Sequence, residues 1–275
     1  MTADQAAGQI DGSGTSRARC VLAPNPGMMT LDGTNTWLIA EPGSEAVVVI
    51  DPGPDDEPHL QRVCREAAER GQRVVSIVLT HRHLDHSAGA PRLAELTGAP
   101  VRAVDPAHRL GSEGLTPGDV VGAGGCELRV IKTPGHTSDS VSLHLPADGV
   151  VLTGDTVLGR GTAVIAEDGS LGDYLASLAR LRLLTDETGL QALLPGHGPL
   201  LSDPGAVLDF YLTHRAERLD EVRAALVAGD RSPGEIVPRV YAAVDQALWP
   251  FAASSVRAQL RYLDEQGELP PGVTY

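Results

Sequence analysis

The sequence predicts an α/β domain followed by a small helical module. Short apolar runs rich in β-branched residues, such as 46–50 and 74–79, are typical of strands that are buried on both faces. Segments with apolar residues at helical spacing are interspersed with these runs up to residue 203. After the turn at 203–205 the pattern is nearly all helical, so we expect a module boundary at about residue 204.

The α/β domain is expected to span residues 19–203. Its apolar runs predict short strands, which we place at 36–40, 46–50, 74–79, 101–104, 127–131, 141–145, 150–152 and 192–194. Apolar residues at helical spacing predict helices at 56–70, 87–97 and 171–184. Residues 1–18 are rich in Gly, Ala, Ser and Asp and show no periodicity, so we expect a mobile tail there.

The module, residues 204–275, is expected to contain three helices. A long one is predicted over 206–228 and another over 251–265, which stops near Gly267. Between them a helix is expected to start at Ser232-Pro233, because a serine N-cap precedes proline at the first helical position.

Composition narrows the class of protein. The 275 residues carry a formal net charge of −14, which counts against tight non-specific binding of nucleic acid. The three cysteines are widely spaced, which argues against a disulfide scaffold and against a thiolate metal site. We find no signal-peptide pattern and no apolar run of membrane-spanning length, so a cytoplasmic protein without a membrane partner is expected.

The strongest chemical signal is the run His81-Arg82-His83-Leu84-Asp85-His86, directly after the predicted strand 74–79. It places four potential metal ligands within six residues. The chain has nine histidines in all, so three in so short a window are improbable by chance. Imidazole suits zinc, and a single carboxylate neutralises charge while leaving coordination positions open. The run therefore predicts a catalytic metal site.

Three more candidate ligands lie singly in glycine-flanked turns. They are His136 in 133–137, Asp155 in 152–156 and His197 in 194–198. A glycine beside a ligand lets the backbone turn sharply and approach closely. Alone, each would more often be an ordinary surface residue, but beside the first cluster each becomes a candidate ligand.

The order of these motifs resembles the metallo-β-lactamase superfamily over about residues 20–203. The motifs are His-x-His-x-Asp-His, then Pro-Gly-His, then Thr-Gly-Asp, then Pro-Gly-His-Gly. The resemblance implies a four-layer αββα sandwich with metals at one edge between two sheets. It implies a first metal on His81, His83 and His136, and a second on Asp85, His86 and His197, with Asp155 bridging both. A histidine at 83 disfavours the oxygen-reducing flavodiiron branch, which carries a carboxylate there.

A narrower resemblance, to the beta-lactamase-like protein 2 group, is carried by 25–27, 31–38, 156–162 and 173–178. That group ends in a small winged-helix-like module, which matches the helical segment after 204. Its members include a single-strand-specific endoribonuclease and thioesterases that release polyketides. The resemblance therefore implies the chemistry more firmly than the substrate.

The implied mechanism uses two zinc ions about 3.5–4 Å apart and a bridging hydroxide whose parent water has a pKa of about 7. The hydroxide would attack a carbonyl carbon or a phosphorus. We expect Asp85 to touch it and to manage its proton. Asp51 is either a hydrogen-bond acceptor for a ligand histidine or a turn residue before Pro-Gly. Tyr174 and Arg160 are candidates to face the substrate.

The expected function is a dinuclear zinc-dependent hydrolase of an ester, thioester or related acyl bond in a small molecule. The alternative is an endoribonuclease, a phosphodiesterase acting on single-stranded RNA with the same metal centre. The module has seven arginines and no lysine against ten acidic residues, and it lacks the basic stripe of a nucleic-acid reader. This favours the acyl substrate and argues against sequence-specific DNA recognition. We expect the module to be a cap or a homodimerisation element over the active site.

Two further alternatives are a mononuclear iron enzyme and a non-catalytic regulator, although the complete ligand set disfavours the regulator. His59, His144 and His214 are expected to be structural, and His108 is assigned no role.

Overall fold

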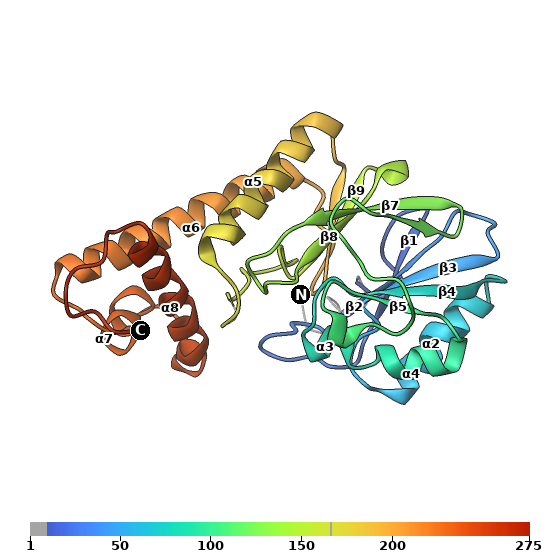
Figure 1. Ribbon diagram of the computed structural model, residues 1–275, viewed down its shortest axis with the longest axis horizontal. Helices are drawn as coiled ribbons and strands as arrows, with labels where there is room; N and C mark the ends of the chain where they lie inside the picture. Colours follow the sequence, from blue (N-terminus) through green and yellow to red (C-terminus); the bar gives the residue numbers. More distant parts are fainter. Residues whose placement is uncertain (1–9, 166) are drawn as a thin grey trace.

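A computed structural model of the chain describes residues 10–165 and 167–275 (Figure 1). Two five-stranded sheets form its centre. The first has the order β1-β2-β3-β4-β5, with bounds Ala18–Leu22, Asn35–Ile39, Ala46–Ile50, Arg73–Val78 and Val101–Arg102. The second has the order β10-β9-β8-β7-β6, with bounds Ala192–Pro195, Val150–Gly154, Val141–Leu145, Cys126–Lys132 and Val120–Ala123. Both sheets are mixed, because β3-β4-β5 and β9-β10 pair in parallel and the other pairs are antiparallel.

Helices cover the outer face of each sheet (Figure 1). On the first sheet these are α2 (Glu57–Ala68) and α4 (Ala90–Thr97), with the single turn α3 (Leu84–Ser87) beside them. On the second sheet they are α5 (Leu171–Thr188) and the start of α6 (Pro204–Val227). Short 3-10 turns occur at Pro106–His108, Pro146–Asp148 and Gln246–Leu248.

Strand β3 shows why its run of apolar residues lacks a polar face. Val48 and Ile50 belong to the core between the two sheets, whereas Val47 and Val49 pack under α2 and α4. Alternate residues of one strand thus fill two different cores. A third core lies between the second sheet and the helices α5 and α6. Four layers, αββα, follow from these three interfaces, which confirms the predicted sandwich.

Helix α6 joins the sandwich to the C-terminal module (Figure 1). Its first half places Leu208 and Tyr211 in the core shared with α5. Its second half places Leu219 and Val222 in a separate core with α7 (Pro233–Val240) and α8 (Trp249–Glu265). Helix α6 begins at Pro204, which is the residue at which the module boundary was expected. The helix packs against both the sandwich and the module.

The N-terminal segment differs from the expected tail. Residues 1–9 lie outside the described residues, but from residue 10 onward the chain packs against the sandwich. Ile10 is buried between the sheets, and Asp11 Oδ1 accepts a hydrogen bond of 2.9 Å from Leu22 N. The edge strand β1 was not expected, because Arg19 interrupts its short apolar run. The expected helix 87–97 is likewise divided into α3 and α4.

Within the described residues, the helices are either too short or too polar to span a membrane.

Candidate metal centre

The seven expected ligands converge at one edge of the sandwich, between the two sheets. The segment 81–86 follows β4, Asp155 follows β9 and His197 follows β10. His136 lies in the loop that joins β7 to β8. Strand ends fix the backbone, and the loops beyond them present polar side chains to a common point.

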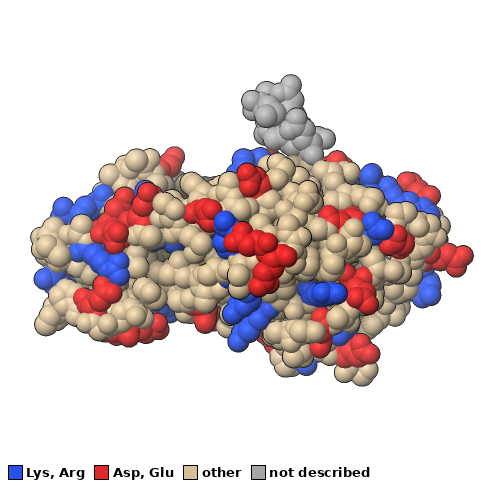
Figure 2. All heavy atoms as spheres, turned by 90° about the horizontal axis from the view of Figure 1, so that it is seen from above, with Lys and Arg blue, Asp and Glu red and all other residues tan. Residues whose placement is uncertain are grey.

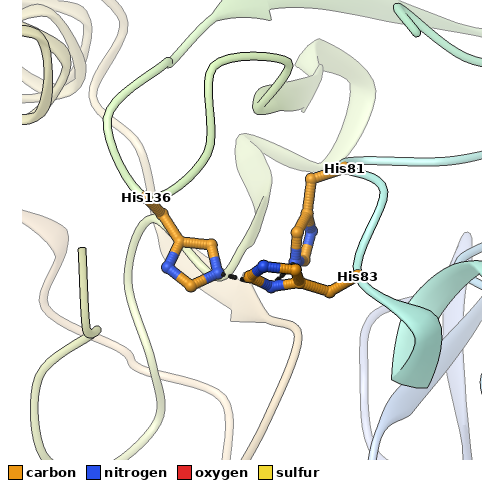
Figure 3. A group of neighbouring side chains, drawn as sticks. All are labelled: His81, His83 and His136. Atoms are coloured by element: carbon orange, nitrogen blue, oxygen red, sulfur yellow. Dashed lines mark hydrogen bonds between the residues drawn. The ribbon is translucent and has the colours of Figure 1, made fainter. Parts of the chain in front are cut away.

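The first group consists of His81, His83 and His136, whose rings converge from two loops (Figure 3). His83 Nδ1 lies 3.2 Å from His81 Nε2 and 3.0 Å from His136 Nε2. One nitrogen of each ring therefore faces a shared point, and the three atoms lie within 4.8 Å of one another. A three-histidine set of this kind suits zinc and leaves a coordination position open.

The second group consists of Asp85, His86 and His197. His197 Nε2 lies 3.1 Å from both His86 Nε2 and Asp85 Oδ2. Asp155 lies between the groups: its Oδ1 is 3.4 Å from His86 Nε2, and its Oδ2 is 3.4 Å from His197 Nε2 and 3.7 Å from His136 Nε2. Asp155 is therefore in reach of both groups.

Hydrogen bonds on the far side of the rings decide which nitrogen faces the centre. His197 Nδ1 donates to Gly33 O at 3.0 Å, and His86 Nδ1 donates to Asp51 Oδ2 at 2.9 Å. With Nδ1 protonated, a neutral ring presents a bare lone pair at Nε2. The two Nε2 atoms nevertheless face each other at 3.1 Å, which needs a positive charge between them. A metal cation fits this requirement.

His136 is oriented in the same way. Its Nδ1 donates to Val164 O at 2.6 Å, which turns its Nε2 toward the first group. Val164 lies outside the motifs that carry the candidate ligands. Any residue type can supply a backbone carbonyl, so the sequence does not mark this position. Such outer partners fix both the tautomer and the direction of a ligand ring.

Asp51 combines the two roles that its position allowed. It has a positive φ of 51°, so it shapes a turn, and its buried carboxylate also holds His86. Thr80 donates to it twice, from N at 2.7 Å and from Oγ1 at 2.6 Å. Three donors thus occupy the carboxylate, so we place Asp51 behind the ligands although it lies close to His81 and His86.

Burial and neighbouring charges shift the pKa values of these side chains in different directions. Burial, together with the adjacent ring of His86, lowers the pKa of His81 well below its usual value. Burial also lowers the pKa of His86, but the Asp155 and Asp51 carboxylates outweigh it and hold the pKa well above its usual value. Burial raises the pKa of Asp155, yet His197 and His86 outweigh this and hold it well below its usual value. A buried, ionised Asp155 needs a positive neighbour, which a metal cation held by these residues would also supply.

The two candidate substrate residues are placed differently from each other. Tyr174 is fully buried, and its hydroxyl donates to Thr156 O at 2.7 Å, so it cannot face a substrate. That expectation is corrected: helical spacing on α5 turns Tyr174 toward the core. Arg160 has an exposed side chain that is paired with Asp32, and it lines a pocket beside the metal centre.

This pocket has a volume of about 740 Å³ and lies between the sandwich and the module. His136 and Asp155 are among the residues that line it. Much of its wall is apolar, including Met28, Met29, Leu31, Leu158, Val164, Val240, Val244, Leu248 and Phe251. Several wall residues come from the module, the segment for which a cap over the active site was one expectation.

Arg215 of α6 also lines the pocket, and sequence reasoning missed it. A signal was present, because the buried stripe of α6 runs through Leu208, Tyr211, Arg215, Leu219 and Val222. A charged residue in the middle of a buried stripe is unusual and marks a position with a special role.

Comparison with known proteins agrees with this architecture. Residues 29–197 match the family model of the metallo-beta-lactamase superfamily, and residues 232–268 match the beta-lactamase associated winged helix domain. A "Beta-lactamase-like protein 2 homolog" from Drosophila melanogaster is 32% identical over 93% of this chain and 90% of its own length.

An "Atrochrysone carboxyl ACP thioesterase" from Aspergillus fumigatus is 34% identical over 75% of this chain and 64% of its own length. Among solved structures, a beta-lactamase domain protein from Burkholderia ambifaria has a TM-score of 0.77 at 25% identity, over 94% of this chain and 90% of that one. Together with the converging histidine and aspartate ligands, these matches show that the chain belongs to the metallo-beta-lactamase superfamily of hydrolases.

Proposed function

We propose that the chain is a dinuclear zinc-dependent hydrolase that cleaves a thioester, ester or related acyl bond. The observation that carries this proposal is the largely apolar pocket of about 740 Å³, whose lining includes the candidate ligands His136 and Asp155. An apolar wall suits the hydrocarbon part of an acyl substrate. A relative that is named as an ACP thioesterase supports the same bond type.

In this proposal one zinc ion is held by His81, His83 and His136, and another by Asp85, His86 and His197. Asp155 is in reach of both positions. Zinc there would supply a water of lowered pKa and a Lewis acid for the acyl oxygen.

Asp85 is the residue we assign to proton transfer. Its side chain is 29% exposed, against 11% for Asp155, so it is the more accessible of the two carboxylates. Although burial raises the pKa of Asp85, the hydrogen bond from His197 and the nearby ring of His86 bring it below its usual value. An ionised Asp85 can accept a proton from the attacking water. The water oxygen bonds to the acyl carbon, the carbon–sulfur or carbon–oxygen bond breaks, and the proton passes to the leaving group.

Three of the four arginines that line the pocket are paired with carboxylates, which argues against a polyanionic substrate such as RNA. Arg218 is paired with Glu221 at 2.8 Å, and Arg239 with Asp230 at 2.5 Å. Arg160 is paired with Asp32, as described above. Figure 2 shows acidic and basic side chains interspersed over the face in view, rather than gathered in a basic stripe. RNA-binding surfaces need net positive charge along the backbone track.

A hydrolysis panel with zinc-loaded protein tests the proposal. The panel holds a thioester, a lactone, a nitrocefin-type lactam and single-stranded RNA, each with wild type and Asp85→Ala. We expect turnover of the thioester or the lactone, and a loss of at least about 100-fold in the variant. Cleavage of RNA alone would replace the proposal by the endoribonuclease. Bound iron in place of zinc, or two bound zinc ions without any turnover, would contradict it.

A further inference from the structure

Arg215 carries a buried positive charge without an acidic partner. Only 5% of the residue is exposed, and it forms no ion pair with any carboxylate in the described part of the chain. One guanidinium nitrogen donates to Ala163 O, and the guanidinium carbon lies 4.8 Å from the centre of the Tyr174 ring. Its Nε is buried and has no hydrogen-bond partner. An uncompensated buried charge is costly, so a fixed guanidinium of this kind is ready to receive an anion.

The other arginines of the pocket do not share this property. Arg160, Arg218 and Arg239 are each paired with a carboxylate, as described above. Among the described residues that line the pocket, Arg215 is therefore the arginine whose charge is left uncompensated. The largely apolar wall therefore holds one arginine that no carboxylate of the described residues pairs.

The structure ties Arg215 closely to the metal centre. Arg215 donates to the carbonyl of Ala163, and His136 donates to the carbonyl of the next residue, Val164, at 2.6 Å. The guanidinium and a metal-binding ring are thus anchored on adjacent peptide units. Both Arg215 and His136 line the same pocket. An anion at Arg215 would belong to the molecule whose reactive bond lies at the metals.

We infer that Arg215 forms a carboxylate-binding subsite, and that the acyl group hydrolysed by this chain carries an acidic group of its own. This inference rests on the proposed acyl hydrolysis. The planar fork of a guanidinium matches the two oxygens of a carboxylate. A single uncompensated charge balances a monoanion, whereas a phosphate dianion would leave excess negative charge in an apolar pocket. Val240, Val244 and Phe251 would cover the hydrocarbon part.

Binding measurements on the zinc-loaded full chain test the subsite without any turnover. Calorimetry would compare hexanoate with hexanamide, which has the same chain without the charge. We expect hexanoate to bind wild type at least about tenfold more tightly. Similar affinities of wild type for the two ligands would overturn the inference, and this comparison requires no variant.

Variants identify the residue responsible. We expect Arg215→Gln to weaken hexanoate binding about 10- to 100-fold and to leave hexanamide unchanged, while Arg215→Lys keeps part of the preference. Arg223→Gln is the matched control, because it removes a charge from the same helix where the arginine is paired with Glu268 at 2.7 Å, outside the pocket. Equal weakening of both ligands, or no change, in Arg215→Gln would overturn the inference. Zinc content is measured for each protein, so that a lost metal is recognised.

Kinetics separates this inference from the proposed function. The substrates are N-acetylcysteamine thioesters of hexanoate and adipate, which differ in a terminal carboxylate. We expect wild type to prefer the adipoyl thioester in kcat/KM by about tenfold or more, and Arg215→Gln to lose this preference. If neither thioester is hydrolysed while hexanoate binding still depends on Arg215, the acyl hydrolase fails and the subsite stands. If both are hydrolysed equally and hexanoate binds no better than hexanamide, the subsite fails and the hydrolase stands.

Discussion

Replacement of Asp51 by asparagine changes one buried carboxylate into an amide of almost the same shape. Three donors converge on this carboxylate: Thr80 N at 2.7 Å, Thr80 Oγ1 at 2.6 Å and His86 Nδ1 at 2.9 Å. Asparagine keeps one acceptor oxygen and replaces the other by two donors. Its φ of 51° remains accessible, because asparagine is among the residues enriched in the left-handed region. The folded backbone should therefore persist in Asp51→Asn.

The expected loss of zinc affinity follows from the hydrogen bonds that Asp51→Asn removes. His86 loses a charge-assisted hydrogen bond of about 1.5–3 kcal/mol, since an N–H of the ring would face an amide N–H. Loss of an outer partner of a metal ligand typically lowers metal affinity about 10- to 100-fold. We expect the loss to fall mainly on the group formed by Asp85, His86 and His197. His81 reaches Asp51 only through Thr80, whose Oγ1 lies 3.1 Å from His81 Nδ1, so the three-histidine group should be affected less.

Stepwise zinc affinities from competition with a chromophoric chelator measure this effect. Asp56→Asn is the matched control, because Asp56 caps α2 by accepting from His59 N at 2.8 Å, and asparagine caps a helix equally well. We expect the control to bind zinc as wild type does. Two zinc ions bound to Asp51→Asn with wild-type affinities, or both weakened by the same factor, would refute the reasoning.

Three more predictions concern stability. Burial lowers the pKa of His59 from 6.5 to about 4, so between these pH values the unfolded chain binds a proton that the folded chain does not bind. The free energy of unfolding should therefore decrease by about 3 kcal/mol as the pH falls through this range. Urea unfolding of His59→Gln should lack this pH-dependent component. Gly135→Ala should destabilise by about 3 kcal/mol in the same assay, because its φ is 134° and a Cβ would lie 2.3 Å from Tyr174 Cα; wild-type stability would contradict this. Tyr174→Phe should cost about 1–3 kcal/mol in thermal unfolding by leaving Thr156 O without its bond, and an unchanged Tm would count against that role.

The candidate ligand set could be proposed from the sequence because its members lie in short motifs after strands, in an order that resembles a known superfamily. The run from His81 to His86 follows β4, and His197 follows β10. The outer partners could not be predicted in the same way. Gly33 and Val164 contribute only backbone carbonyls, and these come from segments far away in the chain. No residue type marks such a position.

The fold was predictable where burial is complete. Strand β3 is apolar at every position because both of its faces are covered, whereas β1 carries Arg19 and gave no clear pattern. Tyr174 was expected to face the substrate but is a core residue of α5, whereas Arg215 of α6 was not singled out and lines the pocket. Spacing alone identifies the buried stripe of a helix, but only the packed structure shows that one part of the stripe borders a pocket.

The proposed function requires seven ligands that hold two zinc ions for acyl hydrolysis. Its most direct test is zinc content by plasma mass spectrometry, measured with thioester turnover on wild type and His197→Ala. We predict two zinc ions per chain in wild type and one in the variant, because His81, His83 and His136 remain intact, with turnover lost in the variant. One iron ion or no metal in wild type, without thioester turnover, would contradict the account.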